Sequence, residues 1–191
     1  MGLFCSTLVT FVILFGPLIT YLPIFMGATH GSSSLIIGLV VATASPITAL
    51  ASIQEGWLTS YFSGKTLIRM SFVLYAVALI LIPLVPNVWL LLVLTVIFGI
   101  AQSLNLPPAF SLLNEAAPDE NRGAFISINS TILRLGQTLG LVFMSAAAIP
   151  VGLARAYFAG AALAAAMFLV ALILIRSSSS SSARRDPKTV P

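Results

Sequence analysis

The sequence predicts an all-α membrane protein with six transmembrane helices, and three observations lead to this fold class. Of the 191 residues, 59% are hydrophobic and 7% are charged, whereas roughly 25% of the residues in a soluble domain are charged. No charged side chain occurs before Glu55. Six segments are apolar over about 20 residues, which is the length that a helix needs to cross a bilayer. A soluble globular fold is therefore excluded.

The first two predicted spans cover residues 3–25 and 35–53 and contain no charged residue. A signal peptide is the alternative at the amino terminus, but this segment lacks a basic n-region and its apolar stretch is longer than an h-region. We therefore favour a spanning helix. Pro17, Pro23 and Pro46 lie in these spans, where their missing N–H groups predict kinks or bends.

The third and fourth spans share one uncharged stretch, from Met70 to Asn114, which is too long for a single helix across the membrane. Pro83, Pro86 and Asn87 interrupt this stretch. Two helices joined by a tight turn therefore fit better than one helix. These two spans are predicted at residues 67–85 and 88–113.

The fifth and sixth spans, residues 124–149 and 156–175, follow a loop of the form Pro-Asp-Glu-x-Arg-Gly. The acids of this loop precede the helix that begins near Ala124, where the positive end of the helix dipole favours them. Gly136 and Gly140 are four residues apart in the fifth span and share one helix face. Because small residues let a neighbouring backbone approach closely, these two glycines predict helix packing.

The positive-inside rule assigns the orientation, because Lys and Arg in short loops are retained on the cytoplasmic side. Lys65, Arg69 and Arg122 fall on one side of the six predicted spans, together with the basic carboxy terminus, and only Arg155 falls on the other. Both termini are therefore predicted to be cytoplasmic, in an integral protein of the cell membrane.

The chain divides into a six-helix transmembrane domain, residues 1–175, and a tail, residues 176–191. The tail is rich in Ser, carries four of the nine Lys and Arg residues, and has almost no apolar residues to bury. This composition predicts a disordered cytoplasmic tail. The lipid bilayer is the expected surrounding of the first region.

The scarcity of reactive side chains excludes most enzymatic and metal chemistry. The chain has one Cys and one His, so it has no disulfide framework, no Cys-based zinc site and no His cluster. His30 lacks the Gly-x-Ser-Gly partner of a rhomboid-type protease, and a His-Glu-x-x-His sequence is absent. The Lys and Arg residues form no basic stripe with interleaved aromatics. We predict no catalytic residue, no metal, no cofactor and no nucleic-acid partner.

Residues 56–65 read Gly-Trp-Leu-Thr-Ser-Tyr-Phe-Ser-Gly-Lys. This segment resembles the loop between the second and third helices of major facilitator superfamily transporters, which has the form G-x-L-x-D-R-x-G-R-[RK]. Gly56, Leu58 and Lys65 match this pattern. Ser60 stands where the family has Asp, so the match is partial.

A longer resemblance runs from the fourth span into the fifth. The segments that carry it are Gly99-Ile100-Ala101-Gln102, Pro107-Pro108, residues 114–123 (Asn-Glu-Ala-Ala-Pro-Asp-Glu-Asn-Arg-Gly) and residues 135–140 (Leu-Gly-Gln-Thr-Leu-Gly). They look like helix ten, the following cytoplasmic loop and helix eleven of drug-efflux-type major facilitators. Six spans with both ends inside then imply the carboxy-terminal half of a major facilitator type twelve-helix bundle.

The resemblance implies a secondary active transporter of small molecules that alternates access between two six-helix halves, with the substrate near the midplane between them. Proton-coupled efflux by antiport is the mode that the family suggests. The second half is expected to be a missing amino-terminal half, a second copy or a partner subunit. The alternative is a truncated or accessory membrane subunit without transport activity of its own.

Polar side chains inside the spans are the candidate substrate-cavity residues, because each costs free energy unless it is paired or faces water. Arg134 lies about ten residues, or about 15 Å, into the fifth span, which is too deep for easy snorkelling. A later helix start, which lets Arg134 reach the interface, is the alternative. The uncharged candidates, which either line a cavity or bridge helices, are Gln102, Asn105, Asn129, Gln137 and Tyr21.

The sequence features and the family resemblance conflict about the charge of the substrate. No carboxylate of this chain lies at the depth of Arg134, so its partner is expected from another half, another protomer or an anionic substrate. The absence of acids in the spans argues against a half-site for cations. Related families, however, often export cationic drugs, and the sequence alone assigns no substrate.

Glu115 and Arg122 frame the loop between the fourth and fifth spans. We expect them to contact the loop at Gly56 and Lys65 and to lock the cytoplasmic face of the transporter during alternating access. The alternative is a capped and charged loop with no role in gating.

Overall fold

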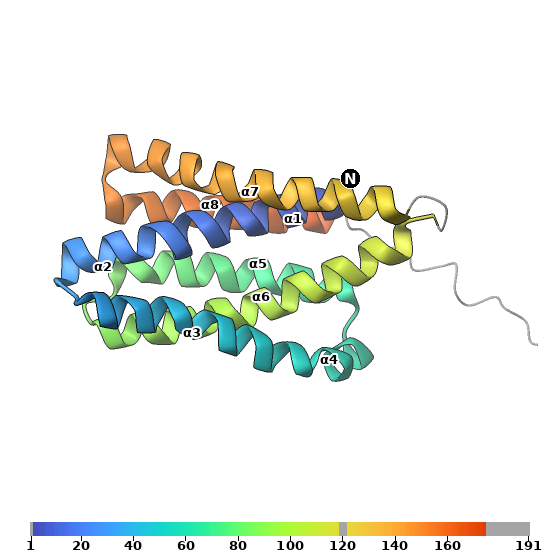
Figure 1. Ribbon diagram of the computed structural model, residues 1–191, viewed down its shortest axis with the longest axis horizontal. Helices are drawn as coiled ribbons and strands as arrows, with labels where there is room; N and C mark the ends of the chain where they lie inside the picture. Colours follow the sequence, from blue (N-terminus) through green and yellow to red (C-terminus); the bar gives the residue numbers. More distant parts are fainter. Residues whose placement is uncertain (1, 119–121, 175–191) are drawn as a thin grey trace, which may run out of the picture.

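A computed structural model describes residues 2–118 and 122–174, and in these ranges the chain forms helices that run along one long axis (Figure 1). The predicted all-α fold with six membrane spans is confirmed. The predicted tail lies outside the described residues. The elements are α1 (Gly2–Ile13), η1 (Leu14–Tyr21), α2 (Leu22–His30), α3 (Ser34–Ile53), α4 (Glu55–Tyr61), α5 (Gly64–Leu81), η2 (Ile82–Leu84), α6 (Val88–Ala116), α7 (Arg122–Val151) and α8 (Leu153–Leu174).

The helical stretches that are long and apolar enough to cross a membrane agree with the predicted spans to within a few residues at each end. They are Gly2–His30, Ser34–Ile53, Gly64–Leu84, Val88–Glu115, Gly123–Val151 and Leu153–Ile173. The main difference is the turn between the last two, where a single residue, Gly152, separates α7 from α8. Gly152 has a φ of 86°, a left-handed conformation that glycine adopts without steric cost. The chain therefore reverses without a loop.

The segment after the second span is helical rather than a loop. Glu55–Tyr61 forms the short helix α4, and α5 begins at Gly64, three residues before the predicted start of the third span. Ser63 caps α5, because its side chain accepts the backbone N–H of Thr66 at 3.3 Å. Serine is favoured at this position because its oxygen satisfies an N–H group that the first helical turn leaves free.

The first span changes its helical geometry halfway along. Leu14–Tyr21 forms the π-helical segment η1, which contains Pro17. The N–H of Leu22 bonds to the carbonyl of Pro17, five residues earlier, and Thr20 Oγ1 donates to the carbonyl of Phe15 at 2.8 Å. Proline has no N–H with which to continue the α-helical pattern. The distortion at Pro17 therefore takes the form of a wider helical turn, a feature found often at functional sites.

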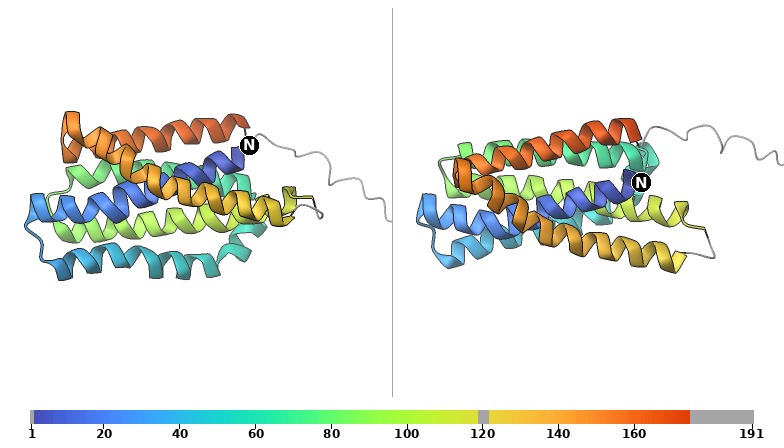
Figure 2. Two further views of the ribbon diagram at one scale, coloured as in Figure 1. Left: turned by 45° about the horizontal axis from the view of Figure 1, so that its top comes forward. Right: turned by 90° about the horizontal axis from the view of Figure 1, so that it is seen from above.

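The helices form an elongated bundle with two edges. In Figure 1, α3 lies next to α6 along one side of the bundle, and α7 lies along the other side with α8 and α1. Seen from above in Figure 2, α7 and α3 lie towards the same side, away from α8. The most extensive contacts join α3 to α6, α5 to α6, α5 to α8 and α1 to α7. The start of α1, α4 and the end of α6 lie at one end of the bundle, which we call the α4 end. The α2–α3 and α7–α8 connections lie at the other, which we call the α2 end (Figure 1).

The core between the helices is apolar and aromatic. Phe72 and Tyr75 of α5, Phe98 of α6 and Tyr157 of α8 are all fully buried. The ring centroids of Tyr75 and Phe98 are 4.7 Å apart, a spacing at which tilted aromatic pairs attract each other. This cluster fixes α5 between α6 and α8.

The spans differ in how much of each the bundle covers. In an 18-residue window, 11% of the residues of α3 and 17% of those of α7 are buried, against 39% to 56% in the other four spans. Large apolar side chains such as Leu39 on α3 and Leu135 on α7 are about half exposed. The described residues therefore leave one broad face of α3 and one of α7 uncovered.

Candidate functional site

Asn105 lies at the centre of a buried hydrogen-bond network between three helices. Thr10 Oγ1 of α1 donates to Asn105 Oδ1 at 2.9 Å and shares its proton with the carbonyl of Ser6 at 2.8 Å. Asn105 Nδ2 of α6 donates to Ser71 Oγ of α5 at 2.7 Å, and Ser71 Oγ donates to the carbonyl of Ile68 at 2.7 Å. Asn105, Thr10 and Ser71 are all fully buried. The sequence left two roles open for Asn105, lining a cavity and bridging helices. In this network Asn105 bridges helices.

Gln102 lies one turn before Asn105 on α6 and faces α3. Thr48 of α3 donates to Gln102 Oε1 at 3.2 Å and lies 3.1 Å from the carbonyl of Gly99. The two backbones are close here, because a Cβ atom added to Gly99 would be 2.7 Å from the carbonyl oxygen of Ala44. Gln102 therefore contributes to the tight α3–α6 contact and is half-buried.

Tyr21, at the end of η1, binds α7. Its hydroxyl donates to Ser145 Oγ at 2.9 Å. On the other side, the hydroxyl of Tyr157 from α8 donates to the carbonyl of Pro17 at 3.2 Å. Side chains of both neighbouring helices thus hold the π-helical segment.

Asn129 of α7 is 3% exposed, and its Oδ1 atom has no hydrogen-bond partner among the described residues. Ser6 Oγ and Tyr75 OH are also buried and also have no hydrogen-bond partner among the described residues. Such atoms are costly in the absence of a partner. The sequence pointed to Asn129, but it offered no reason to select Ser6, because Ser is common in apolar helices where it bonds to its own backbone.

Arg134 occupies the exposed side of α7. We call Thr131, Arg134, Gln137 and Thr138 the Arg134 patch: they lie within two helical turns, and all are exposed except Gln137, which is half-buried. Thr138 Oγ1 donates to the carbonyl of Arg134 at 3.3 Å. Within residues 2–118 and 122–174, neither the guanidinium of Arg134 nor the amide of Gln137 makes a hydrogen bond or an ion pair.

Gly136 and Gly140 line the opposite side of α7, against α1. A Cβ atom on Gly136 would be 2.8 Å from the carbonyl oxygen of Leu8, and one on Gly140 would be 2.6 Å from that of Val12. In return, a Cβ atom on Gly16 of η1 would be 2.5 Å from the carbonyl oxygen of Gly140. At 3.6 residues per turn, Arg134 points roughly 160° away from Gly136. The glycine contact with α1 therefore directs Arg134 away from this bundle.

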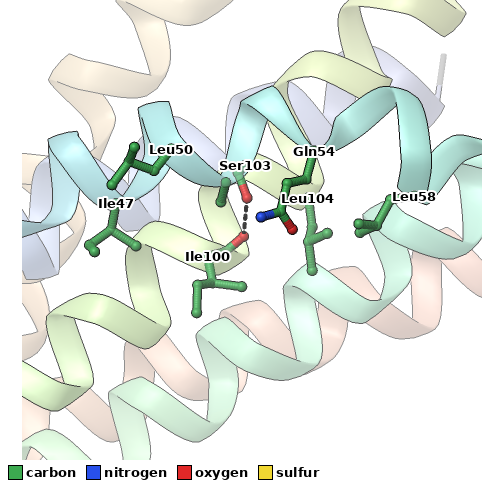
Figure 3. A pocket seen from close by; sticks show the side chains of 8 residues that line it. Ile47, Leu50, Gln54, Leu58, Ile100, Ser103 and Leu104 are labelled. Carbon is green, nitrogen blue, oxygen red and sulfur yellow. Dashed lines mark hydrogen bonds between the residues drawn. The ribbon is translucent and has the colours of Figure 1, made fainter.

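A cavity of about 320 Å³ lies between α3, α4 and α6 towards the α4 end (Figure 3). Most of its lining is apolar, and its polar side chains are Gln54 and Ser103. Ser103 Oγ donates to the carbonyl of Ile100 at 2.8 Å. Neither residue was predicted, although a glutamine at the end of the second span and a serine beside Gln102 were visible signals. The lining consists of Ile47, Leu50, Ala51, Gln54, Leu58, Ile100, Ser103 and Leu104.

The four predicted gate residues all lie at the α4 end. Gly56 belongs to α4 and Lys65 to the first turn of α5, where Lys65 is half-buried. Glu115 is exposed in the last turn of α6. Arg122 begins α7, but its side chain lies outside the described residues. These segments share one end of the bundle, and the contact between them stays a prediction.

Arg69 makes an interaction that the sequence did not identify. Its Nε donates to the carbonyl of Ala171 at 3.3 Å. Ala171 lies near the carboxy-terminal end of α8. Arg69 therefore joins α5 to the end of α8. The sequence could supply only its position near a membrane interface.

Among the described residues, no group of three or more His, Cys, Asp or Glu side chains is placed to hold a metal ion. The side chains that could bind a ligand are instead the polar ones within the spans, on α1, α3, α6 and α7. Hydrogen bonding and binding of charged or polar solutes are what such groups can do.

The chain is similar to several transporters over most of its length. It is 30% identical to "Probable anion transporter 5" of Arabidopsis thaliana over 75% of this chain and 33% of that protein. It is 25% identical to "Uncharacterized MFS-type transporter YqjV" of Bacillus subtilis over 65% of this chain and 30% of that protein. It is 28% identical to "Multidrug resistance protein 3" of Bacillus subtilis over 69% of this chain and 26% of that protein.

The matched region is about a third of the length of these relatives or less. The sequence pattern described as Major Facilitator Superfamily covers residues 1–190 of the chain. Six apolar helices in one bundle agree with this match. The protein is therefore a membrane protein of a transporter family, and the chain belongs to the major facilitator superfamily.

Proposed function

We propose that this chain is one six-helix half of a secondary transporter of small molecules that works by alternating access between two halves. The observation that carries the proposal is the unequal burial of the spans. Over the 18 residues compared in each span, only 11% of the residues of α3 and 17% of those of α7 are buried within this chain. In carriers of this kind, substrate sites lie near the bilayer midplane at the interface between repeats. We assign the uncovered faces of α3 and α7 to that interface.

A further six-helix half is the occupant that best fits these faces. The relatives are roughly three times as long as the part that this chain matches, so they have room for an amino-terminal half. A second copy of this chain or a partner subunit is the alternative source. Isolated polar side chains such as Arg134 would then face a water-filled interface instead of lipid.

The α4 end is proposed to face the cytoplasm in the cell membrane. Lys65, Arg69 and Arg122 lie in segments at this end, and basic residues are retained there during insertion. The gate is assigned to the same end, with Gly56 and Lys65 of the α4–α5 region opposite Glu115 and Arg122. A basic tail, residues 176–191, is expected on the same side.

Proton-coupled efflux is the finer part of the proposal. The five acidic residues of the chain all lie outside the middle of the predicted spans. A proton carrier must therefore come from the other half. In that case, proteoliposomes that contain both halves show transport driven by a pH gradient, whereas those with this chain alone show none.

The first experiment sequences the transcript upstream of the codon for Met1. The complete reading frame and the 191-residue chain are then expressed separately, purified and reconstituted in liposomes. Exchange of labelled organic anions, neutral metabolites and cationic dyes is measured in both. We expect exchange with the complete frame only. Exchange by neither preparation favours the accessory-subunit alternative and contradicts the proposal, and exchange by the short chain favours pairing of two copies.

A further inference from the structure

Arg134 is at the middle of its membrane span. The midpoint of Gly123–Val151 is Gln137, and Arg134 is three residues from it, or about 4.5 Å along the axis at 1.5 Å per residue. The hydrocarbon core extends about 15 Å to either side of the bilayer centre. The alternative of a later helix start therefore does not apply, since α7 begins at Arg122. With this midpoint at the bilayer centre, the backbone of Arg134 lies about 10 Å inside the nearer edge of the hydrocarbon core, which makes snorkelling of the guanidinium difficult.

The side chain of Arg134 also faces away from the helices of this chain. The glycine face of α7 packs against α1, and Arg134 lies on the opposite, exposed side. An arginine at the centre of a span costs about 2.5 to 3.5 kcal/mol on the insertion scale when it is left in lipid. A stable structure avoids this cost when the charge faces water or a partner. Arg134 thus points into the interface that the proposed function assigns to α7.

The neighbours of Arg134 favour an anion as that partner. The guanidinium offers five N–H donors in a fork that matches a carboxylate or phosphate. Gln137, one turn away on the same side, adds an amide whose two N–H groups are unused among the described residues. No acid of this chain lies near mid-span. The flanking Thr131 and Thr138 donate their hydroxyl protons to carbonyl groups of their own helix, and among the described residues neither hydroxyl oxygen accepts a bond from the guanidinium.

We propose that the Arg134 patch is an anion-binding half-site that attracts small organic or inorganic anions into the substrate cavity. The guanidinium of Arg134 supplies the charge and a bidentate contact, and the amide of Gln137 supplies a second donor. This inference rests on the proposed function, because it requires that the exposed side of α7 faces a water-filled interface. A carboxylate from the other half that pairs permanently with Arg134 is the competing arrangement.

The charge of the cavity can be measured without knowing the substrate. Cys5 is the only cysteine, so Cys5→Ser removes the native thiol of this chain, and any cysteine of the other half is replaced likewise. Thr138→Cys then places one thiol a turn from Arg134. The thiol is reacted with the anionic reagent MTSES and the cationic reagent MTSET, and the ratio of their rates is divided by the same ratio for a free thiol in solution. Val73→Cys, on an exposed mid-span position of α5, is the control for a lipid-facing thiol.

We expect MTSES to react with the thiol of the Thr138→Cys variant at least about tenfold faster than MTSET after this correction, because a unit charge within one turn acts on the two reagents with opposite sign. Adding Arg134→Gln brings the corrected ratio close to one. Adding Arg134→Lys keeps a ratio well above one because it keeps the charge. The Val73→Cys control reacts with neither reagent, since both are membrane-impermeant.

Two results overturn the inference. A corrected ratio near one with Arg134 present, which turns in favour of MTSET in Arg134→Gln, identifies a permanent carboxylate partner. No reaction of the Thr138→Cys variant with either reagent places the patch in lipid or in a sealed contact. Transport by the complete frame with a ratio near one leaves the proposed function standing and removes this site. A strong MTSES preference without any transport supports the anion-binding site and contradicts the proposed transport function.

Discussion

At the scale of single residues, the amide of Asn105 connects three helices. Its two hydrogen bonds reach Thr10 on α1 and Ser71 on α5, partners that are 95 and 34 residues away in the sequence. The hydroxyl protons of both partners also reach backbone carbonyls. Each of the three side chains therefore has partners inside the bundle, which explains how these polar groups remain buried among apolar helices.

A double-mutant cycle tests this network. Asn105→Ala, Ser71→Ala and the double variant are unfolded reversibly in mixed micelles, and the free energy of unfolding is measured by circular dichroism. We expect a coupling of about 0.6 kcal/mol, and no more than about 1.7, which is the range for hydrogen bonds between membrane helices. Ser130→Ala is the control, because its hydroxyl bonds only to the carbonyl of Ile126. Equal coupling of Asn105→Ala to Ser71→Ala and to Ser130→Ala would contradict the network.

Arg69 makes a second residue-scale prediction. Replacement by Ala removes both the hydrogen bond to the carbonyl of Ala171 and a positive charge near the end of α8, which the helix dipole favours. We expect Arg69→Ala to lower the free energy of unfolding by about 1 kcal/mol. Arg69→Lys keeps the charge and loses less. Thermal unfolding of the three proteins checks this order, and identical midpoints for the two variants would show that the charge has no effect.

Individual site residues were only partly predictable from the sequence. Arg134 was identifiable because a charged side chain is rare inside a span. The partners of Asn105 were not, because they depend on which helices pack together. Gln54 and Ser103 were not predicted for the same reason, since the cavity that they line is formed by three separate helices.

At the scale of elements, the α1–α7 contact depends on small residues at both surfaces. Gly136 and Gly140 of α7 admit the backbone of α1, and Gly16 meets Gly140 at the π-helical segment. Here the sequence predicted the packing face from a four-residue spacing. It did not predict the π-helical turn, because proline signals a break in hydrogen bonding but not the geometry that replaces it.

Gly140→Ala tests the closest contact. Its Cβ would lie 2.6 Å from the carbonyl oxygen of Val12, so the helices must separate, and we expect a loss of about 1 to 3 kcal/mol in the free energy of unfolding. Gly123→Ala is a matched control on the same helix, where a Cβ meets nothing within 4 Å. The control is expected to be neutral or slightly stabilising. Similar losses in both variants would indicate a backbone effect instead of a steric one.

The existence of the spans was predictable because a bilayer imposes a minimum length of apolar helix. Their ends were less so. The short helix α4 and the single-residue turn at Gly152 depend on capping and on one left-handed residue, which a hydropathy pattern does not encode.

At the scale of the whole molecule, the unequal burial of the spans indicates which faces another half covers. Spin labels can report this through their accessibility to oxygen, which is high in lipid and low inside protein. Leu39 on α3 and Leu135 on α7 are the test positions, and Val77 on α5 is the control, since all three are exposed within this chain.

We expect oxygen accessibility at Leu39→Cys and Leu135→Cys to fall severalfold when the labelled chain is part of the complete transporter, compared with the 191-residue chain alone. The Val77→Cys label should not change, because α5 lies between α6 and α8. A fall at Val77 that equals the fall at Leu135 would show that α5 also faces the partner.

The one-residue turn at Gly152 also affects how the protein is made. With only Gly152 between them, we expect α7 and α8 to enter the bilayer together as a helical hairpin. The fifth span is the least apolar of the six and contains Arg134, whereas the sixth is among the more apolar. The charged and least apolar span is therefore followed at once by a more apolar one, and we expect α8 to assist the insertion of α7 as it leaves the ribosome.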